Sequence, residues 1–135
     1  MPAATDSIRL KQLTPVLVVE AVEPCLPFWR DRLGFTVENE LPGPDGALIF
    51  ASAKRDGIEV MYQTRASVLS ENPGMAEDLK GHSVTLFITV DDFEPVARAL
   101  DGAPVVKPRH DTFYGSTEIY VREPGGNTVG FAAFK

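Results

Sequence analysis

Short apolar runs separated by turn residues follow one another along the chain, and they predict strands mixed with helices. Residues 14–20 form a β-branched run of strand length, and an amphipathic stretch with Pro24 near its start then ends at Leu33-Gly34. Proline is tolerated in the first turn of a helix, and glycine suits the position after the last turn. The pattern therefore predicts a strand that leads into a helix.

Three further strands are predicted in the first half. Residues 35–41 and 47–52 are strand-like, and the Asp45-Gly46 pair between them is a strong turn signal. A second turn at residues 54–57 precedes a strand at residues 58–63. The first half is thus predicted to be a βαβββ unit.

The second half predicts the same order of elements. A strand at residues 84–90 is followed by a helix that Asp91 or Asp92 caps and that runs to about Leu100. The remaining strands are predicted at residues 105–109, 116–122 and 128–134.

A direct sequence match supports two copies of one plan. Val18–Pro24 matches Thr89–Pro95 at a constant offset of 71 residues. We predict an α+β fold in which two βαβββ repeats form a curved mixed sheet around a central cleft. Repeat one spans about 14–63, a connector follows at 64–82, and repeat two spans about 83–135, all within a single domain of residues 1–135.

Alternation along the strands predicts which side chains lie under the helices, because successive strand residues point to opposite faces. Each helix covers only one face of its sheet, so the other faces are expected to pair around a cleft, within one chain or between two chains. The predicted core consists of Leu17, Val19, Val60, Leu86, Ile88 and Phe131, with Leu26, Trp29, Leu33, Val96 and Leu100 as helix partners.

Charge and composition narrow the classes of partner. The net charge of −6 argues against nucleic-acid binding, which needs clustered Lys and Arg, and the acidic balance favours a neutral or cationic ligand. No apolar run approaches the length of a membrane span, and the first dozen residues do not look like a secretory signal. The one cysteine, Cys25, is expected to be a small buried residue. We expect a cytoplasmic protein with no nucleic-acid or membrane partner.

Two segments carry a family resemblance. Phe28–Phe35 holds an aromatic pair, a charged turn and Leu-Gly-Phe, and a second segment runs from Tyr114-Gly115 through Glu118 to the turn at Val121–Asn127. They resemble the vicinal oxygen chelate superfamily, which includes glyoxalase I, extradiol dioxygenases, and fosfomycin and bleomycin resistance proteins. The resemblance covers nearly the whole chain after Leu13. It implies the fold predicted above and a homodimer whose clefts are completed by the second chain.

In metal-dependent members of that superfamily, four strand positions hold one divalent ion. The resemblance places these positions at Thr14, Glu59, Thr85 and Gly130, of which Glu59 alone keeps a competent metal ligand. A catalytic divalent ion normally takes about three protein ligands. His82, three residues before Thr85, would face the wrong side of the strand. We therefore expect no metal, no other cofactor and no assigned catalytic residue.

The predicted cleft is apolar with few polar groups, which suits a flat or bulky organic molecule. Glu59 either faces the cleft as the counter-charge of a cationic ligand, or points to solvent or pairs with Arg55 or Arg122. His110 and Tyr114 are candidates at the cleft edge, with strand packing as the alternative for Tyr114. The candidate ligand-binding residues are Thr14, Val16, Glu59, Met61, Thr85, Phe87, His110 and Tyr114.

These residues favour metal-independent binding or sequestration of a small aromatic or cationic organic molecule, in the manner of bleomycin resistance proteins. The alternative is a metal-dependent lyase, isomerase or dioxygenase of the same superfamily, with relocated ligands or with Glu59 as a general base. A third possibility is an interaction module whose cleft is filled by its own side chains. Metal content distinguishes the first two, and thermal stabilisation by ligands tests the third.

Overall fold

The computed structural model describes residues 7–9, 11–77, 79–80 and 84–135, so His82 lies outside the described residues.

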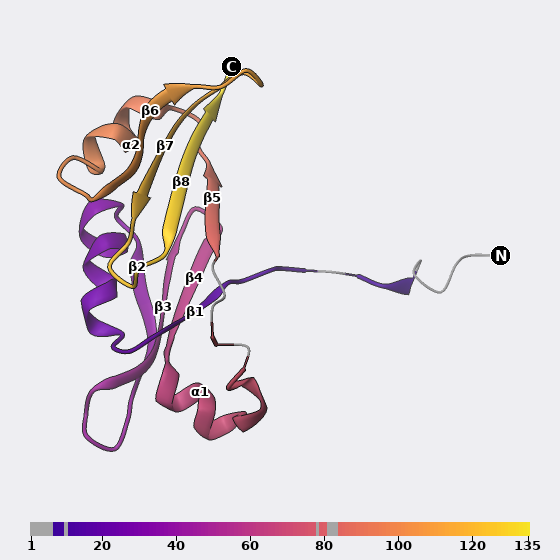
Figure 1. The fold of residues 1–135 in the computed structure, drawn as a ribbon, viewed down its shortest axis with the longest axis vertical. Coiled ribbons are helices and arrows are strands. Elements are labelled where there is room, and N and C mark those ends of the chain that lie inside the picture. Colours follow the sequence, from indigo (N-terminus) through magenta and orange to yellow (C-terminus); the bar gives the residue numbers. More distant parts are fainter. Residues whose placement is uncertain (1–6, 10, 78, 81–83) are drawn as a thin grey trace.

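The first half of the chain forms a four-stranded mixed sheet. Asp56 and Gly57 connect two strands with positive φ angles of 52° and 80°, which a tight two-residue hairpin requires. β1 and β4 are parallel, and the other neighbours are antiparallel. The strands are β1 (Val16–Val19), β2 (Thr36–Pro42), β3 (Leu48–Arg55) and β4 (Ile58–Thr64), in the order β1-β4-β3-β2 (Figure 1).

The second half repeats this topology. Its strands are β5 (Thr85–Thr89), β6 (Val105–Asp111), β7 (Ser116–Arg122) and β8 (Thr128–Phe134), in the order β5-β8-β7-β6. β5 is parallel to β8, and the other pairs are antiparallel. The predicted α+β class, with two βαβββ units and mixed sheets, is confirmed. β6 runs past its predicted end because His110 and Asp111 still pair with β7.

The helices are short, and in Figure 1 the segment 23–32 and α2 (Phe93–Ala99) lie on the same side of the two sheets. The side chain of Asp92 caps α2 by accepting a hydrogen bond from the backbone N–H of Glu94. The predicted helix of the first half is present as one helical stretch over residues 23–32, but its geometry is mixed, with a 3-10 turn at Glu23–Cys25 that leads through Leu26 and Pro27 into a π-helix at Phe28–Arg32. Pro27 lies between them and lacks the backbone donor that a continuous α-helix would need.

The connector between the halves is partly helical. α1 (Arg65–Glu71) begins after Thr64, whose hydroxyl accepts a hydrogen bond from the backbone N–H of Ser67. A 3-10 helix at Pro73–Met75 follows. No helix in the described part of the chain has the length and apolar character needed to cross a membrane.

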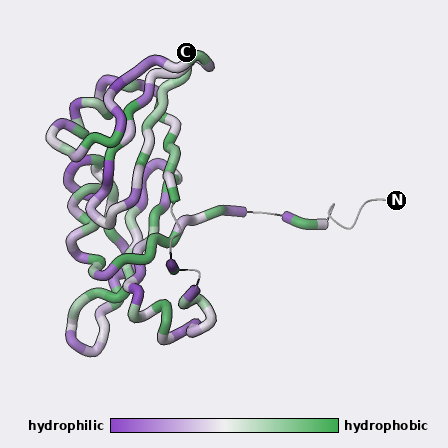
Figure 2. The backbone as a smooth tube through the Cα atoms, in the orientation of Figure 1, coloured by the Kyte–Doolittle hydropathy of each residue, from purple (hydrophilic) through white to green (hydrophobic). Residues whose placement is uncertain are grey.

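Both halves contribute side chains to one buried apolar cluster, and the predicted core is confirmed. Leu17, Val19, Val60, Phe131, Leu26, Trp29 and Leu100 are buried, and Leu86, Ile88, Leu33 and Val96 pack against them half-buried. The Trp29 ring packs edge-on against the rings of Phe28 and Phe35, with centroids 5.1 Å apart in each pair. Cys25 is buried in the same cluster, as expected from its sequence context. Figure 2 shows hydrophobic and hydrophilic stretches alternating along the strands.

Candidate functional site

A row of polar side chains on β7 points away from the core. Ser116, Glu118 and Tyr120 alternate with Ile119 and Val121, which pack in or against the apolar cluster. Successive residues of a strand point to opposite faces, so the three polar groups share the other face of the second sheet. Glu118 is nevertheless only 1% exposed. Its neighbours therefore enclose a carboxylate on the sheet face opposite the apolar core.

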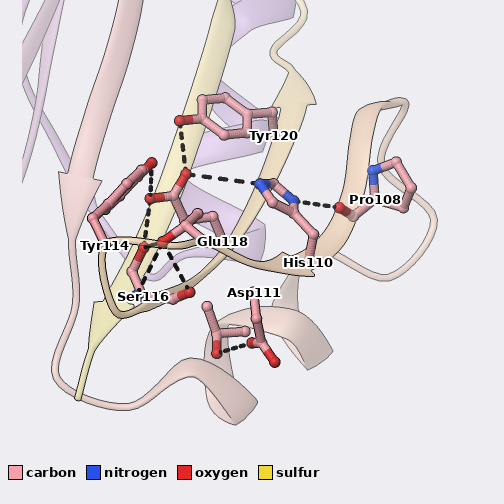
Figure 3. A network of polar contacts seen from close by, with 9 residues as sticks. Pro108, His110, Asp111, Tyr114, Ser116, Glu118 and Tyr120 are labelled. Carbon is pink, nitrogen blue, oxygen red and sulfur yellow. Dashed lines mark hydrogen bonds and ion pairs between the residues drawn. The ribbon is translucent and has the colours of Figure 1, made fainter.

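Three hydroxyl groups hold the carboxylate of Glu118 (Figure 3). Tyr114 Oη and Ser116 Oγ each donate a hydrogen bond of 2.7 Å to Oε2, and Tyr120 Oη donates one of 3.0 Å to Oε1. Burial alone raises the pKa of Glu118, but the three hydrogen bonds and the nearby His110 outweigh burial, and the pKa lies below its ordinary value. The site thus carries a fixed negative charge.

The two phenols keep their protons. The hydrogen bond to Glu118, and then burial, raise the pKa of Tyr114, while burial first and then the same carboxylate raise the pKa of Tyr120. Gly130 makes room for the second ring, since a Cβ atom at that position would lie 2.3 Å from Cε2 of Tyr120. A glycine on β8 therefore positions a donor on β7.

His110 approaches the carboxylate from β6, where it pairs across the strands with Glu118. Its Nδ1 lies 2.8 Å from the carbonyl oxygen of Pro108, and its Nε2 lies 3.9 Å from Oε1 of Glu118 (Figure 3). The imidazole is stacked beside the ring of Tyr120, with centroids 6.3 Å apart and planes 20° apart. The ring is thus oriented by the backbone on one side and by a phenol on the other.

These side chains line a pocket of about 570 Å³. Phe113 is fully exposed at its rim and packs edge-on against Tyr114, with centroids 5.2 Å apart. The volume is in the range of small-molecule sites. The pocket is lined by Val106, Lys107, His110, Asp111, Thr112, Phe113, Tyr114, Glu118 and Tyr120. One buried anion between aromatic rings can orient a small molecule that carries hydrogen-bond donors.

Two of the predicted site residues, His110 and Tyr114, line this pocket, and two more lie on β5 of the same sheet. Thr85 and Phe87 are exposed, and Phe87 pairs with Gly130, the residue beneath Tyr120. The strand register therefore puts Phe87 beside the polar row, outside the pocket lining.

The other four predicted residues gather on the first sheet. Val16 pairs with Met61 across β1 and β4. Gln12 Nε2 donates to Oγ1 of Thr14 at 2.8 Å and to Oε1 of Glu59 at 2.9 Å. No hydrogen bond or ion pair among the described residues joins this group to the candidates on the second sheet.

The Glu59 side chain is 9% exposed, and its cationic partner differs from those predicted. Lys54 Nζ lies 3.7 Å from Oε2 of Glu59. Arg55 and Arg122 instead donate to backbone carbonyl groups. The correction follows from strand pairing, because Lys54 is the residue directly opposite Glu59 in the β3–β4 hairpin.

The register also corrects the predicted equivalence of Glu59 with Gly130. Val16 and Phe87 keep the offset of 71 residues, but Val16 pairs with Met61 while Phe87 pairs with Gly130. Met61, rather than Glu59, therefore occupies the place of Gly130. The second unit is two residues shorter before its last strand, so a single offset does not hold along the whole repeat.

The positions that the superfamily uses for a divalent ion do not fit a metal centre here. The carboxylate of Glu59 is engaged by Gln12 and Lys54, and Gly130 supplies no side chain. Among residues 7–9, 11–77, 79–80 and 84–135, no three His, Cys, Asp or Glu side chains converge so that they could hold an ion. The donor set falls short of the roughly three protein ligands that a catalytic divalent ion takes.

Glu118 and Tyr120 are site residues that sequence reasoning did not single out. The available signal was a polar side chain at every second position through Tyr114, Ser116, Glu118 and Tyr120. Such alternation normally indicates a strand with one face in water. The alternation therefore predicted a solvent-exposed Glu118, whereas the structure buries its carboxylate.

A second pocket, of about 640 Å³, lies between the segment 27–32 and the β7–β8 turn. Its polar groups are committed to the fold. Arg32 donates to the carbonyl groups of Ala99 and Asp101, and Glu123 accepts four hydrogen bonds from its surroundings. The pocket beside Glu118 is consequently the stronger candidate.

Fold and sequence together identify the class of protein. Residues 9–131 match the family model of the Glyoxalase/Bleomycin resistance protein/Dioxygenase superfamily, and the chain belongs to that superfamily. It is 31% identical over 118 residues to the uncharacterized protein Mb0911c of Mycobacterium bovis. The aligned residues cover 85% of this chain and 78% of the relative.

Solved structures share the fold at low sequence identity. TioX from Micromonospora sp. ML1 aligns with a TM-score of 0.74 at 19% identity, over 93% of this chain and 99% of that one. Lactoylglutathione lyase from Agrobacterium tumefaciens aligns with a TM-score of 0.70 at 18% identity, over 94% and 100%. These likenesses establish the architecture.

Proposed function

We propose that this protein binds a small aromatic or cationic organic molecule in the pocket beside Glu118, without a metal ion, and sequesters it in the manner of bleomycin resistance proteins. The observation that carries the proposal is the buried carboxylate of Glu118, held ionised by three hydroxyl groups at the wall of a pocket of about 570 Å³. A fixed charge in an apolar surround orients a ligand strongly, because the local dielectric is low.

The lining of the pocket supports an aromatic guest. The rings of His110, Tyr114 and Tyr120 surround the carboxylate, and Phe113 extends the aromatic surface into solvent. Aromatic side chains bind flat molecules by stacking and by burial of apolar area. A negative charge bordered by rings also favours a cation.

We further propose that two copies associate as a homodimer, built from single domains of residues 1–135. Four large apolar or aromatic side chains with exposures of 44–50% support this: Val16, Phe87, Tyr114 and Phe134. In a homodimer, the first-sheet group of one copy, Thr14, Val16, Glu59 and Met61, would cover the second-sheet pocket of the other. The rings of Tyr114 and Phe134 lie together, with centroids 6.2 Å apart, and exposed apolar surface of this kind commonly marks an interface.

A cytoplasmic location completes the proposal. The lone thiol of Cys25 is buried and has no cysteine partner in the sequence, as suits a protein of a reducing compartment.

The binding proposal is tested by thermal-shift and calorimetric screening against aromatic amines, amidines and their neutral analogues. A compound that binds only the folded state must raise Tm. Saturable binding that Tyr120→Ala weakens is expected. A broad screen at millimolar concentration with no shift for any compound would contradict the proposal.

Metal content and oligomeric state are separate measurements. Elemental analysis of protein purified without chelator is expected to find transition metal far below one equivalent, and a near-stoichiometric content would favour an enzyme. Sedimentation equilibrium is expected to report twice the 14.7 kDa chain mass. A monomer at all concentrations would remove the homodimer from the proposal.

A further inference from the structure

Among the described residues, three hydroxyl groups donate to the carboxylate of Glu118, which leaves one of its acceptor positions. An ionised carboxyl group has about four lone-pair sites, two on each oxygen. Tyr114 and Ser116 occupy both sites of Oε2, and Tyr120 occupies one site of Oε1. Glu118 and His110 both line the pocket, and Nε2 of His110 lies 3.9 Å from Oε1, which is too long for a direct hydrogen bond.

The imidazole of His110 presents a second acceptor at the same place. Its Nδ1 lies 2.8 Å from the carbonyl oxygen of Pro108, and a carbonyl oxygen only accepts, so Nδ1 carries the proton of the neutral ring. Nε2 then carries a lone pair and lies 3.9 Å from Oε1 of Glu118. Two acceptors therefore lie 3.9 Å apart in the pocket lining (Figure 3).

We propose that Oε1 of Glu118 and Nε2 of His110 form a two-acceptor subsite for an organic cation with N–H donors, and that protonation of His110 closes this subsite. The inference rests on the proposed function, since it specifies which ligands the pocket accepts. An amidinium, guanidinium or primary ammonium group supplies both the N–H donors and the positive charge that the anionic Glu118 selects. A planar cation also stacks beside the nearly parallel rings of His110 and Tyr120.

Protonation of His110 removes the subsite because Nε2 then donates toward Glu118 and no longer accepts from a ligand. A proton on Nε2 turns an acceptor into a donor that faces Oε1, and the resulting imidazolium neutralises Glu118. Among the described residues, the other charged groups near His110 are Lys107 and Asp111 in the pocket lining and Arg109 on the same strand, and the charge of Lys135 acts on Asp111. Arg109 is paired with Glu94 on α2, and Asp111 accepts from Thr117.

A proton on the imidazole adds a positive charge at the place where the ligand's own charge would bind. Affinity for the cation is expected to decrease with acidification, while affinity for an uncharged analogue changes much less.

The test uses benzamidine as the cationic probe and benzamide as its neutral analogue. Titration calorimetry of the full chain at pH 8 and pH 5.5 measures both affinities. Wild-type protein is expected to prefer benzamidine by about tenfold or more at pH 8, as for one charge-assisted hydrogen bond, and to lose most of that preference at pH 5.5.

Three variants separate the contributions. Glu118→Gln is expected to abolish the preference for benzamidine at both pH values. His110→Gln keeps an acceptor that does not titrate, so it is expected to retain the preference and lose the pH dependence. Glu77→Gln is the matched control, because Glu77 is an exposed carboxylate paired with Lys80 outside the pocket lining, and it is expected to behave as wild type.

Equal binding of the two probes, or an unchanged preference in Glu118→Gln, overturns the subsite. If other aromatic compounds still bind the pocket in that case, the proposed function stands. If Glu118→Gln does not fold, His110→Gln decides: loss of the pH dependence supports the subsite, and its persistence overturns it.

Discussion

Tyr62 Oη donates a hydrogen bond of 2.6 Å to Oε2 of Glu123 and accepts one of 2.8 Å from Nε1 of Trp29. This chain of contacts joins β4 of the first sheet, the helical segment before β2, and the turn between β7 and β8 of the second sheet. All three side chains are buried, and burial together with the charge of Glu123 raises the pKa of Tyr62 well above its ordinary value. The phenol therefore acts as a permanent donor between the two halves.

Tyr62→Phe is expected to lower the free energy of unfolding by about 1–3 kcal/mol, because it leaves a buried indole N–H without its acceptor and a buried carboxylate short of one donor. Urea unfolding followed by circular dichroism measures the change. Thr117→Val is the matched comparison, since it also removes a hydroxyl donor from a carboxylate, but that carboxylate belongs to Asp111, which is exposed, so water can replace the donor. Equal losses in the two variants would contradict a special role for Tyr62.

Gly130→Ala is expected to destabilise the protein by about 1–3 kcal/mol, the usual range for forcing an atom into a packed site. The added Cβ would lie 2.3, 2.7 and 2.9 Å from three ring atoms of Tyr120, so the ring must move away from Glu118. Ligand binding should weaken together with stability. Gly74→Ala provides the control, because nothing lies within 4 Å of a Cβ there, and its stability is expected to be unchanged or slightly higher.

Acid should destabilise the wild-type protein more than Glu118→Gln. Hydrogen bonds hold the pKa of Glu118 below its ordinary value in the folded state, so the unfolded chain binds more protons as the pH falls. This contribution to stability is fully present above about pH 4.5 and is lost as the pH falls through the lowered pKa. Urea midpoints measured from pH 7 to pH 3 test it. Parallel curves for the two proteins would show that Glu118 contributes nothing to the acid response.

Cys25 should resist alkylation in the native protein. Burial, and then the charge of Glu123, raise the pKa of its thiol to about 12, so the reactive thiolate is scarce at pH 8. Iodoacetamide labelling followed by mass spectrometry is expected to be slow in buffer and fast in urea. Ser70→Cys adds an exposed thiol on α1 and should label at once. Rapid native labelling of Cys25 itself would show that this region opens readily.

The strands and the core were predictable from local spacing. In β1, the buried Leu17 and Val19 alternate with more exposed residues, and Val60 belongs to the same kind of pattern in β4. This period of two specifies a strand with one buried face. The helix after β1 was predicted less well. Pro27 interrupts its hydrogen-bond pattern, and a helical stretch with mixed geometry has no distinct signature in amphipathic spacing.

The site was predictable only in part. His110 and Tyr114 were identified as candidates, and both line the pocket, but Glu118 at its centre was not. Burial of a carboxylate depends on donors that reach it from other positions, here Tyr114 in the loop before β7 and Tyr120 above Gly130 of β8. No property of residue 118 by itself distinguishes it from a solvent-facing glutamate.

In this protein, the sequence pattern determines the secondary structure and the apolar core, and the tertiary structure determines the contacts between polar side chains. Its repeated alternation of apolar and polar residues determined the α+β class, the two βαβββ units and much of the apolar core, because burial of an apolar face is a local and periodic property. Only the tertiary structure decided that Glu59 meets Lys54 and that Glu118 meets His110. Those encounters depend on strand register and turn length, and a difference of two residues between the units is enough to change which side chains face each other.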